Sequence, residues 1–433
     1  MFRYSLFFLI MLIGPLGDSK AQKQHSTENA LCEQLISYHA SDNFIKTFIA
    51  KRRILRSVED FESLVQAIQT CPFYSEKVAR TGFIEWEYKL DSLEYHTIVI
   101  VPNDYHPEKR YPVSFIFHGG VTSANPKTVK NYIQPRTYNL NTLERIVVYP
   151  SGWALSPWWS ESQVRNMQYL FKRIKRNYNI DENRVHLSGI SDGGTGVFYI
   201  GNVLGTPWSA FCPYISNPLG VMQLGKQPVY LFNFKNHPFL IISTDQDQLF
   251  PPGRMKSFLK LMDKSGNHYK YYLAEGFEHE MSWYPDYEDI IIEFLENNPR
   301  NPYPDTLFWQ THNVDYGRNY WVRIDRLKKS TFSASQDSLV LCPLEFRNGA
   351  RIGKIQVYHK GNHIFVNTNN IRRYTLFLST EMFDFDRQFM IYTNGKLSYQ
   401  GTLKKDPSVL LKWFKKDIDR TMLFGAEMKV SVE

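Results

Sequence analysis

A serine between two glycines, in the sequence Gly-Ile-Ser-Asp-Gly at positions 189–193, has the spacing of a reactive hydroxyl held on a tight turn. Five residues alone carry limited weight, but an apolar strand pattern, Val185–Leu187, precedes them and a helical pattern follows. A sharp strand-to-helix turn needs small residues two positions before and after the reactive one, because larger side chains would clash there. Ser191 is therefore the predicted nucleophile. Ser188, nearby, lacks small residues at these offsets.

A serine hydroxyl attacks poorly unless a neighbouring base takes its proton. In folds that use this turn, an acid and then a histidine follow the serine along the chain. His279 lies in a loop after the apolar segment Tyr269–Leu273 and is the predicted base. The acid is expected just past Phe239–Ser243, where Asp245 and Asp247 both qualify. We favour Asp247, because the apolar-then-proline sequence after it often trails such an acid; its role is to orient the histidine and stabilise its charged form.

Two backbone N–H groups are expected to stabilise the negative oxygen that forms when the serine attacks a carbonyl carbon. One is the amide of Asp192, at the start of the helix, whose side chain we expect to have no chemical role. The other is expected in the loop His-Gly-Gly-Val at positions 118–121, after an apolar strand. We choose Gly120, with Val121 as the alternative, because glycine allows the backbone to approach a substrate closely. His118 is expected to be structural.

Three tryptophans lie close in sequence to these segments. Trp158 and Trp159 precede a predicted helix, and Trp283 follows the candidate base. All three could line an acyl or sugar subsite, although tryptophan is as often a core residue. The cysteine spacings are not those of a zinc site, and we predict neither a metal nor another cofactor.

The elements that must position these residues lie in residues 81–298, where strand and helix patterns alternate. Two strands, Phe83–Leu90 and Tyr95–Val101, are expected to pair antiparallel across the short turn between them. Short apolar strands then alternate with helices, and the last helix shows apolar residues at helical spacing between Tyr287 and Leu295. This alternation predicts an α/β fold with a mostly parallel sheet covered by helices on both faces.

Two flanking regions differ from this pattern. Residues 22–80 are short and mainly helical in pattern. Residues 299–433 follow a proline-rich linker at 297–304 and are rich in short strands, with a strong hairpin signal at Asn394-Gly395 and one helix that begins after Asp406. We expect this C-terminal region to be a β-rich, sandwich-like domain.

The first residues are typical of a signal peptide, with predicted bounds 1–21. Arg3 supplies the positive start, residues 6–13 are an unbroken apolar run, and small residues stand at the cleavage positions before Gln22. The apolar run is too short to cross a bilayer, which needs about 20 apolar residues, although an uncleaved anchor is the alternative. We expect a soluble, exported protein in the periplasm or outside the cell.

Charge and cysteine content set further limits. The formal net charge of the 433 residues is +8, spread along the chain and without a nucleic-acid motif, so no nucleic-acid partner is predicted. Export permits disulfides, and Cys32 and Cys71 flank one helical segment, which they either staple or leave unlinked. Cys212 and Cys342 lie in apolar surroundings and are expected to be buried thiols.

Together these residues resemble the esterase group of the α/β-hydrolase superfamily that includes polyhydroxybutyrate depolymerases, feruloyl esterases and bacterial predicted peptidases. The resemblance covers about residues 95–298. It implies an α/β-hydrolase fold and a Ser-His-Asp triad, but it leaves the substrate open. Asp192 departs from the methionine more usual after the nucleophile, although Ser-Asp-Gly-Gly also occurs in exported members. The matching segments are 118–120, 149–153, 158–159, 181–185 and 189–193, with Asp247 and His279.

The leading functional expectation is hydrolysis of a carboxylic ester, in a small molecule or attached to a polymer, through an acyl-enzyme intermediate. The alternative is hydrolysis of a peptide or amide, because the same triad serves both reactions. A third possibility is an inactive protein that binds a glycan or a cell-surface partner, against which the complete Ser-Asp-His set argues. We predict no stable membrane insertion, and the sequence leaves the oligomeric state open.

Overall fold

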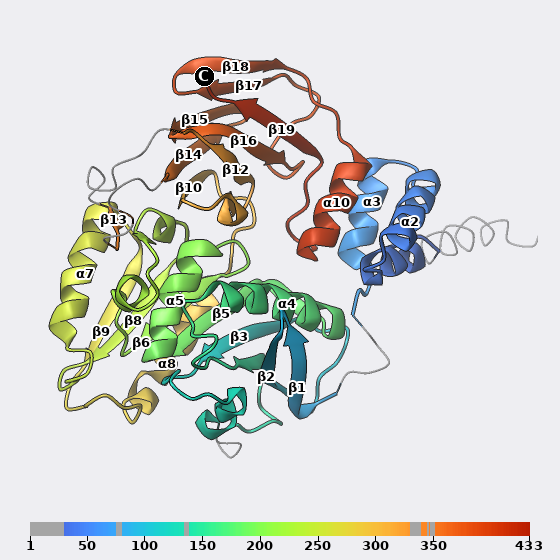
Figure 1. Cartoon of the computed structure of the whole chain (residues 1–433). Coiled ribbons are helices and arrows are strands. Elements are labelled where there is room, and N and C mark those ends of the chain that lie inside the picture. The colour runs from blue at the N-terminus through green and yellow to red at the C-terminus, as the bar shows by residue number, and fades with distance from the viewer. Residues whose placement is uncertain (1–29, 75–79, 134–137, 330–338, 344–345, 347–350) are drawn as a thin grey trace, which may run out of the picture. The chain divides into compact units, whose positions relative to one another are not determined.

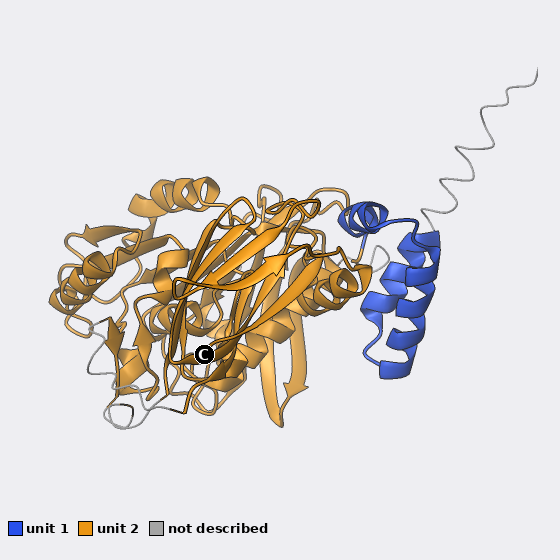
Figure 2. Cartoon of the chain, turned by 90° about the horizontal axis from the view of Figure 1, so that it is seen from above, with its two compact units in different colours: residues 1–72 blue, residues 73–433 orange. Residues whose placement is uncertain are grey.

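The computed structural model divides the chain into two compact units, Met1–Pro72 and Phe73–Glu433 (Figure 2). The predicted signal peptide lies outside the residues that the structure describes. No helix in the described part of the chain is both long and apolar enough to cross a membrane. The described residues are 30–74, 80–133, 138–329, 339–343, 346 and 351–433.

The first unit is helical where it is described, as its sequence pattern predicts. Residues 30–40 are helical, followed by α2 (Phe44–Ser57) and α3 (Phe61–Thr70). Asparagine and aspartate side chains at positions 43 and 60 cap the two later helices by accepting backbone N–H groups of their first turns. A disulfide joins Cys32 to Cys71, which is one of the two outcomes left open by the sequence.

An eight-stranded sheet dominates the second unit, in the order β1-β2-β4-β3-β5-β6-β8-β9 (Figure 1). Only β2 runs against the others, because it pairs antiparallel with both β1 and β4 and every remaining pair is parallel. The predicted mostly parallel sheet is confirmed. The strands are β1 (Gly82–Leu90), β2 (Leu93–Val101), β3 (Tyr111–Phe117), β4 (Ile146–Pro150), β5 (Ile180–Ile190), β6 (Ala210–Tyr214), β8 (Phe239–Thr244) and β9 (Tyr269–Ala274).

Helices pack on both faces of this sheet, because its strands bury apolar side chains in both directions. In β8, Phe239 and Ile241 join the apolar cluster that contains α4, α5 and α7, whereas Leu240 and Ile242 join the cluster that contains α8. Helix α7 was not predicted from the sequence, although its buried residues Met255, Phe258 and Met262 have helical spacing. The helical elements are η1 (Pro126–Tyr132), α4 (Glu161–Asn177), α5 (Asp192–Val203), α6 (Gly220–Gln223), η3 (Asn233–Asn236), α7 (Pro252–Ser265) and α8 (Tyr284–Asn297).

The C-terminal residues form two further sheets, in the orders β10-β14-β15-β17-β18 and β11-β12-β16-β19. Apolar residues from both sheets enter one cluster, as in a sandwich. Asn394 and Gly395 turn between β17 and β18 with positive φ values of 50° and 82°, as their hairpin signal predicts. The elements are β10 (Thr306–Thr311), η4 (Val314–Tyr316), β11 (Arg318–Asn319), β12 (Val322–Leu327), β14 (Gly353–Lys360), β15 (His363–Asn369), β16 (Ile371–Leu378), β17 (Phe389–Thr393), β18 (Lys396–Gly401), α10 (Pro407–Asp417) and β19 (Ala426–Ser431), with a small pair of β7 (Val229–Tyr230) and β13 (Val340–Leu341).

The segment predicted as a proline-rich linker is anchored. Arg300 is only 5% exposed, and its backbone N–H donates to the carbonyl of Asn183 at 2.7 Å. Its guanidinium lies 2.7 Å from a carboxylate oxygen of Asp419. Beside it, Arg420 pairs with Glu182 of β5 at 2.6 Å. Buried ion pairs therefore hold the C-terminal sheets to the α/β part of the same unit.

Candidate active site

Ser191 lies at the turn between β5 and α5, where the sequence predicts it. Its backbone has φ 56° and ψ −118°, a strained positive-φ conformation that costs about 1–3 kcal/mol for a residue other than glycine. A Cβ atom on Gly189 would lie 2.3 Å from the carbonyl oxygen of Gly193, and one on Gly193 would lie 2.2 Å from that of Phe117. Both glycines are therefore sterically required: Gly189 by the turn itself, as the sequence predicts, and Gly193 by the neighbouring strand β3.

His279 connects the serine to an aspartate. Its Nε2 lies 2.8 Å from Ser191 Oγ, and its Nδ1 lies 2.7 Å from Asp247 Oδ2. We call this chain of hydrogen bonds from Ser191 through His279 to Asp247 the relay. The aspartate side chain is 1% exposed and the histidine side chain 22% exposed, so the relay meets solvent only at the end that carries the serine and the histidine. Asp247 Oδ1 accepts the backbone N–H of Phe250, whose ring packs edge-on against the histidine. These contacts hold the imidazole in one orientation.

Asp245, the alternative acid, has a different environment. Its Oδ1 accepts the backbone N–H groups of Gly276 at 2.7 Å and of Phe277 at 3.3 Å. These residues belong to the loop that carries His279, so the side chain of Asp245 shapes that loop. The structure thus brings Asp247, and not Asp245, to the imidazole.

The loop after β3 lies against the serine. A Cβ atom on Gly119 would lie 3.2 Å from Ser191 Cβ and 3.8 Å from its Oγ, while Gly120 has a positive φ of 60°. The N–H of Val121, the alternative oxyanion donor, instead donates to Asp192 Oδ2 at 3.2 Å. The N–H of Asp192 itself lies at the first turn of α5, where amides have no intrahelical acceptor. This arrangement favours Gly120 and Asp192 as the donor pair.

The Asp192 side chain has a structural role, which is compatible with our expectation that it has no chemical one. Through Val121 it ties the N-terminus of α5 to the loop that carries the candidate oxyanion donor. Burial raises the pKa of Asp192, and the hydrogen bond from Val121 opposes that shift. Sequence could not indicate this bond, since its partners are 71 positions apart.

Tyr132 is a neighbour of the site that sequence analysis missed. Its hydroxyl donates to the carbonyl of Gly120 at 3.4 Å, and its ring stacks on His118 with centroids 4.4 Å apart. The side chain is 47% exposed. Burial and the charge of Asp192 raise the pKa of the tyrosine hydroxyl. Tyr132 ends the irregular turn η1, and nothing in its local sequence distinguishes it from a surface tyrosine.

His118 agrees with the structural role expected for it. Its ring is buried, its Nε2 accepts the N–H of Gly152 at 3.1 Å, and its Nδ1 donates to the carbonyl of Gly119 at 2.7 Å. Burial lowers its pKa to about 4, so it is neutral near pH 7. The imidazole therefore braces the loop beside Ser191 without exchanging protons there.

Two of the three predicted substrate-binding tryptophans are core residues. Trp158 is 0% exposed, stacks on Phe117 and donates its indole N–H to the carbonyl of His118. Trp283 is also 0% exposed and packs on Tyr214. Their prediction as subsite residues is wrong, because apolar packing covers both rings completely. Trp159 is half-buried, and its subsite role remains a prediction.

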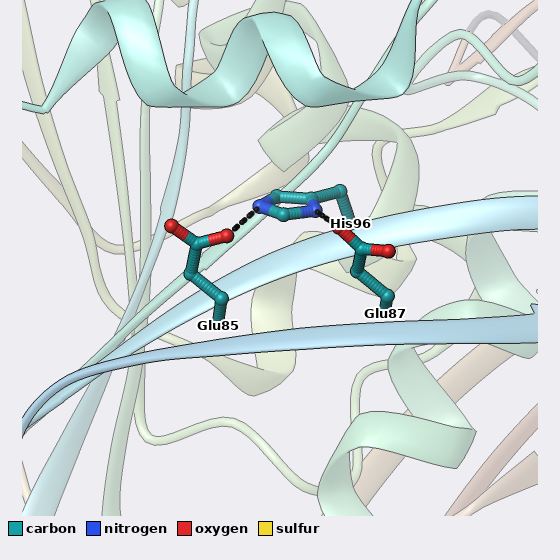
Figure 3. A group of neighbouring side chains, drawn as sticks. All are labelled: Glu85, Glu87 and His96. Atoms are coloured by element: carbon teal, nitrogen blue, oxygen red, sulfur yellow. Dashed lines mark ion pairs between the residues drawn. The ribbon is translucent and has the colours of Figure 1, made fainter.

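One group of side chains of metal-ligating type occurs among the described residues: Glu85, Glu87 and His96, on β1 and β2 (Figure 3). His96 is 1% exposed, and the two carboxylates face opposite nitrogens of its ring, each at 3.4 Å. Lys130 and Lys127 of η1 pair with Glu85 and Glu87 at 2.6 and 2.8 Å. These lysines already balance the carboxylate charge, so the group is better suited to anchoring η1 on the sheet than to binding a metal.

Comparison with known proteins finds distant structural likenesses. The sequence matches no known family profile, and no curated protein is significantly similar to it. A thermostable esterase is 21% identical with a TM-score of 0.41; the match covers 50% of this chain and 63% of that one. A candidate dipeptidyl aminopeptidase IV from Bacteroides ovatus is 15% identical with a TM-score of 0.42; the match covers 52% of this chain and 36% of that one. Esterase 2 from Thermogutta terrifontis is 14% identical with a TM-score of 0.40; the match covers 52% of this chain and 97% of that one.

Proposed function

We propose that this chain is a serine hydrolase of the α/β-hydrolase fold that cleaves a carboxylic ester through an acyl-enzyme. The observation that carries the proposal is the continuous relay from Ser191 Oγ through both nitrogens of His279 to Asp247. A surface serine and histidine seldom share such a contact together with a buried carboxylate. The order of serine, aspartate and histidine along the chain, each after a strand of one parallel sheet, supports the fold assignment.

The proposed mechanism follows from this geometry. His279 takes the proton of Ser191 as the hydroxyl attacks the ester carbonyl, and Asp247 stabilises the resulting imidazolium. The oxygen that becomes negative is stabilised by the amides of Gly120 and Asp192. His279 then returns the proton to the leaving alcohol, and an acyl-serine remains. In the second half, His279 activates a water molecule that releases the acid and restores the serine.

A peptidase or amidase activity is the alternative, because it uses the same groups. An alkoxide leaves more readily than an amine, so ester cleavage demands less from the acid that protonates the leaving group. The resemblance of the motifs to esterases favours the same choice. The exposed ring of Tyr132 and the half-buried Trp159 are the proposed substrate contacts.

An activity panel tests this proposal. We expect the wild-type chain to hydrolyse short p-nitrophenyl esters faster than peptide p-nitroanilides, and Ser191→Ala to lose at least about 10³-fold in kcat/KM. Ser188→Ala, which changes a serine three positions earlier, in the strand β5 that leads into the turn, is the matched control and should retain activity. Equal activity of the wild type and Ser191→Ala, or no activity in either, would refute the triad. Cleavage of anilides without esters would favour the peptidase.

Export is a separate proposal, supported by the sequence of residues 1–21 alone. Expression in a bacterial host followed by mass spectrometry of the periplasmic fraction tests it. We expect a mature N-terminus at Gln22. A chain that stays in the cytoplasm with its N-terminal residues intact would contradict export, without bearing on the hydrolase activity.

A further inference from the structure

Helix α2 (Phe44–Ser57) carries every lysine and arginine among the described residues of its unit. Among residues 30–72 there are five lysines and arginines and five acidic residues, and every one of the basic residues lies in α2 while every acidic residue lies outside it. The net charge of these residues is therefore zero, but the charges are separated. The basic residues are Lys46, Lys51, Arg52, Arg53 and Arg56.

The same helix exposes large apolar side chains. Phe44 is 83% exposed, Ile45 66%, Phe48 51% and Ile49 45%. Phe48 and Ile49 follow Phe44 and Ile45 by four positions, which places all four on one side of the helix. Leu55 lies seven positions after Phe48 and extends that side by about two turns. Single exposed apolar residues are common, but a contiguous row on one helix needs an explanation.

The other side of α2 is already buried, since Ile54, which lies away from the exposed row, is 0% exposed. The helix therefore does not need the exposed row in order to bury a side chain. Arg52 lies over the ring of Phe48, with 5.8 Å from the guanidinium carbon to the ring centroid, so basic and apolar side chains share the exposed side.

We propose that α2 is a peripheral membrane-binding helix, which lies flat on a bilayer rich in anionic phospholipid. A helix with aromatic and aliphatic residues on one side and lysine and arginine around it inserts its apolar side to the level of the headgroups. Its basic residues are attracted by the anionic headgroups. The 14 residues of α2 span about 21 Å, which is enough to place both phenylalanines and Leu55 in the interface together.

Charge complementarity favours an anionic bilayer over a second copy of this helix and over the rest of the chain. A second copy of α2 would bring another five positive charges against the first. Residues 1–29 carry +1 of the chain's formal charge of +8 and residues 30–72 carry none, so Phe73–Glu433 carries +7. The charge of a second α2 and the net charge of Phe73–Glu433 therefore have the same sign as the charge of α2, whereas an anionic bilayer attracts it.

Vesicle co-sedimentation of the chain without its predicted signal peptide, residues 22–433, tests the proposal. We expect binding to vesicles of phosphatidylcholine with about 30% phosphatidylglycerol, little binding to phosphatidylcholine alone, and weakening of the binding as salt is raised. Phe44→Ser combined with Phe48→Ser should reduce the partition coefficient at least tenfold. Arg52→Gln combined with Arg53→Gln should reduce it several-fold for the anionic vesicles only.

Leu397→Ser is the matched control, because Leu397 is 49% exposed on β18 and belongs to the other unit. It should bind like the wild type. Circular dichroism and the intact disulfide Cys32–Cys71 verify that the α2 variants stay folded, and the charge variant, which changes only exposed side chains, provides a second comparison.

Three results would overturn the proposal. The wild type binds neither vesicle, or the α2 variants bind as well as the wild type, or sedimentation shows self-association that the Phe44→Ser and Phe48→Ser changes abolish in the absence of lipid. The last result would assign the row to a contact between copies. None of these measurements depends on hydrolase activity, so the proposal stands or fails separately from the function proposed for Ser191.

Discussion

Two groups of buried charged and polar residues in the second unit differ in how completely they are bonded. The first is the relay at Ser191, which keeps one side open: the side chain of His279 is 22% exposed and the serine backbone is strained. The second is the cluster around Arg300 and Asp419, where both side chains are at most 2% exposed. Comparison of the two shows which buried polar residues are available for chemistry.

The Arg300 cluster leaves little bonding capacity unused. The guanidinium donates to Asp419, to Asn183, to Thr421 and to the carbonyl of Thr206. Burial pushes the pKa of Asp419 upward, but the charges of Arg300 and the neighbouring lysine outweigh burial and hold that pKa well below its usual range. A carboxylate held ionised in this way neither takes nor gives a proton near neutral pH. The cluster is therefore structural.

The relay at Ser191 has the opposite character. Its aspartate is as buried as Asp419, but the chain of hydrogen bonds ends at a hydroxyl with solvent access. The strained turn and the open end persist because the surrounding strand, helix and loop determine them. The comparison suggests that a candidate active site is distinguished by incomplete bonding at one end, and not by burial or by the number of charges.

The largest expected effect separates the two aspartates that follow β8. Asp247→Asn should lower kcat/KM by about 10⁴-fold, because an amide favours the wrong imidazole tautomer. Asp245→Asn is the control, since an amide oxygen can still accept the N–H of Gly276. This variant should lower kcat/KM far less. Steady-state kinetics with a p-nitrophenyl ester measures both. Near-normal turnover in Asp247→Asn would remove it from the relay.

The second effect concerns stability and the other cluster. Arg300→Ala should lower the free energy of unfolding by about 3–5 kcal/mol, because it leaves the Asp419 carboxylate buried without its main partner. Urea denaturation measures this. Arg387→Ala, which removes an arginine that is 81% exposed in an ion pair, is the control and should cause no measurable change. Equal stability of the two variants would contradict the structural role.

The same cluster predicts the direction of acid sensitivity. The pKa of Asp419 is lower in the folded chain than in the unfolded one, so its contribution to stability is present above the unfolded pKa of about 3.9 and is lost as the pH falls towards the folded value. Asp419→Asn should therefore flatten the loss of stability below about pH 4. An unchanged acid profile in that variant would contradict this assignment.

A smaller effect is expected at Asp192, which ties helix α5 to the loop at positions 118–121 that carries the candidate oxyanion donor. Asp192→Ala leaves the N–H of Val121 without its acceptor, which costs about 1–3 kcal/mol if the group stays buried, or lets the loop shift. We expect kcat/KM to fall about tenfold. Asp192→Asn keeps an oxygen acceptor, so its kcat/KM should fall less. Wild-type kinetics in Asp192→Ala would show that the loop holds its position without this bond.

The smallest effect is expected at Tyr132. Tyr132→Phe removes one long hydrogen bond to the carbonyl of Gly120 and keeps the ring on His118, so kcat/KM should fall only a few-fold, equivalent to about 0.5–1 kcal/mol. Tyr399→Phe, which removes a hydroxyl bonded to Thr402 in the C-terminal sheets, should leave kinetics unchanged. A loss of 100-fold or more at Tyr132 would indicate direct contact with the reacting atoms.

Features governed by neighbours in the chain could be predicted from the sequence. The turn at Ser191 follows from the clash that any side chain at Gly189 would cause with Gly193, four positions later, and the hairpin at Asn394-Gly395 follows from the positive φ that these residues tolerate. The alternation of strands and helices is likewise visible in the sequence, because each element shows the apolar spacing of its own buried side. Each depends on residues within a few positions of one another, so local composition was sufficient.

Features that depend on packing between distant segments were decided only by the tertiary structure. The choice of Asp247 over Asp245 rests on which carboxylate reaches an imidazole 32 residues away, and the burial of Trp158 rests on the stack with Phe117. Arg300 lies in a segment whose prolines predict a linker, but its side chain is buried and pairs with the carboxylate of Asp419, 119 positions later. The sequence determined where the nucleophile stands and why its turn is glycine-rich. Only long-range packing decided which side chains surround it, because the partners of each bond meet when the sheet is assembled.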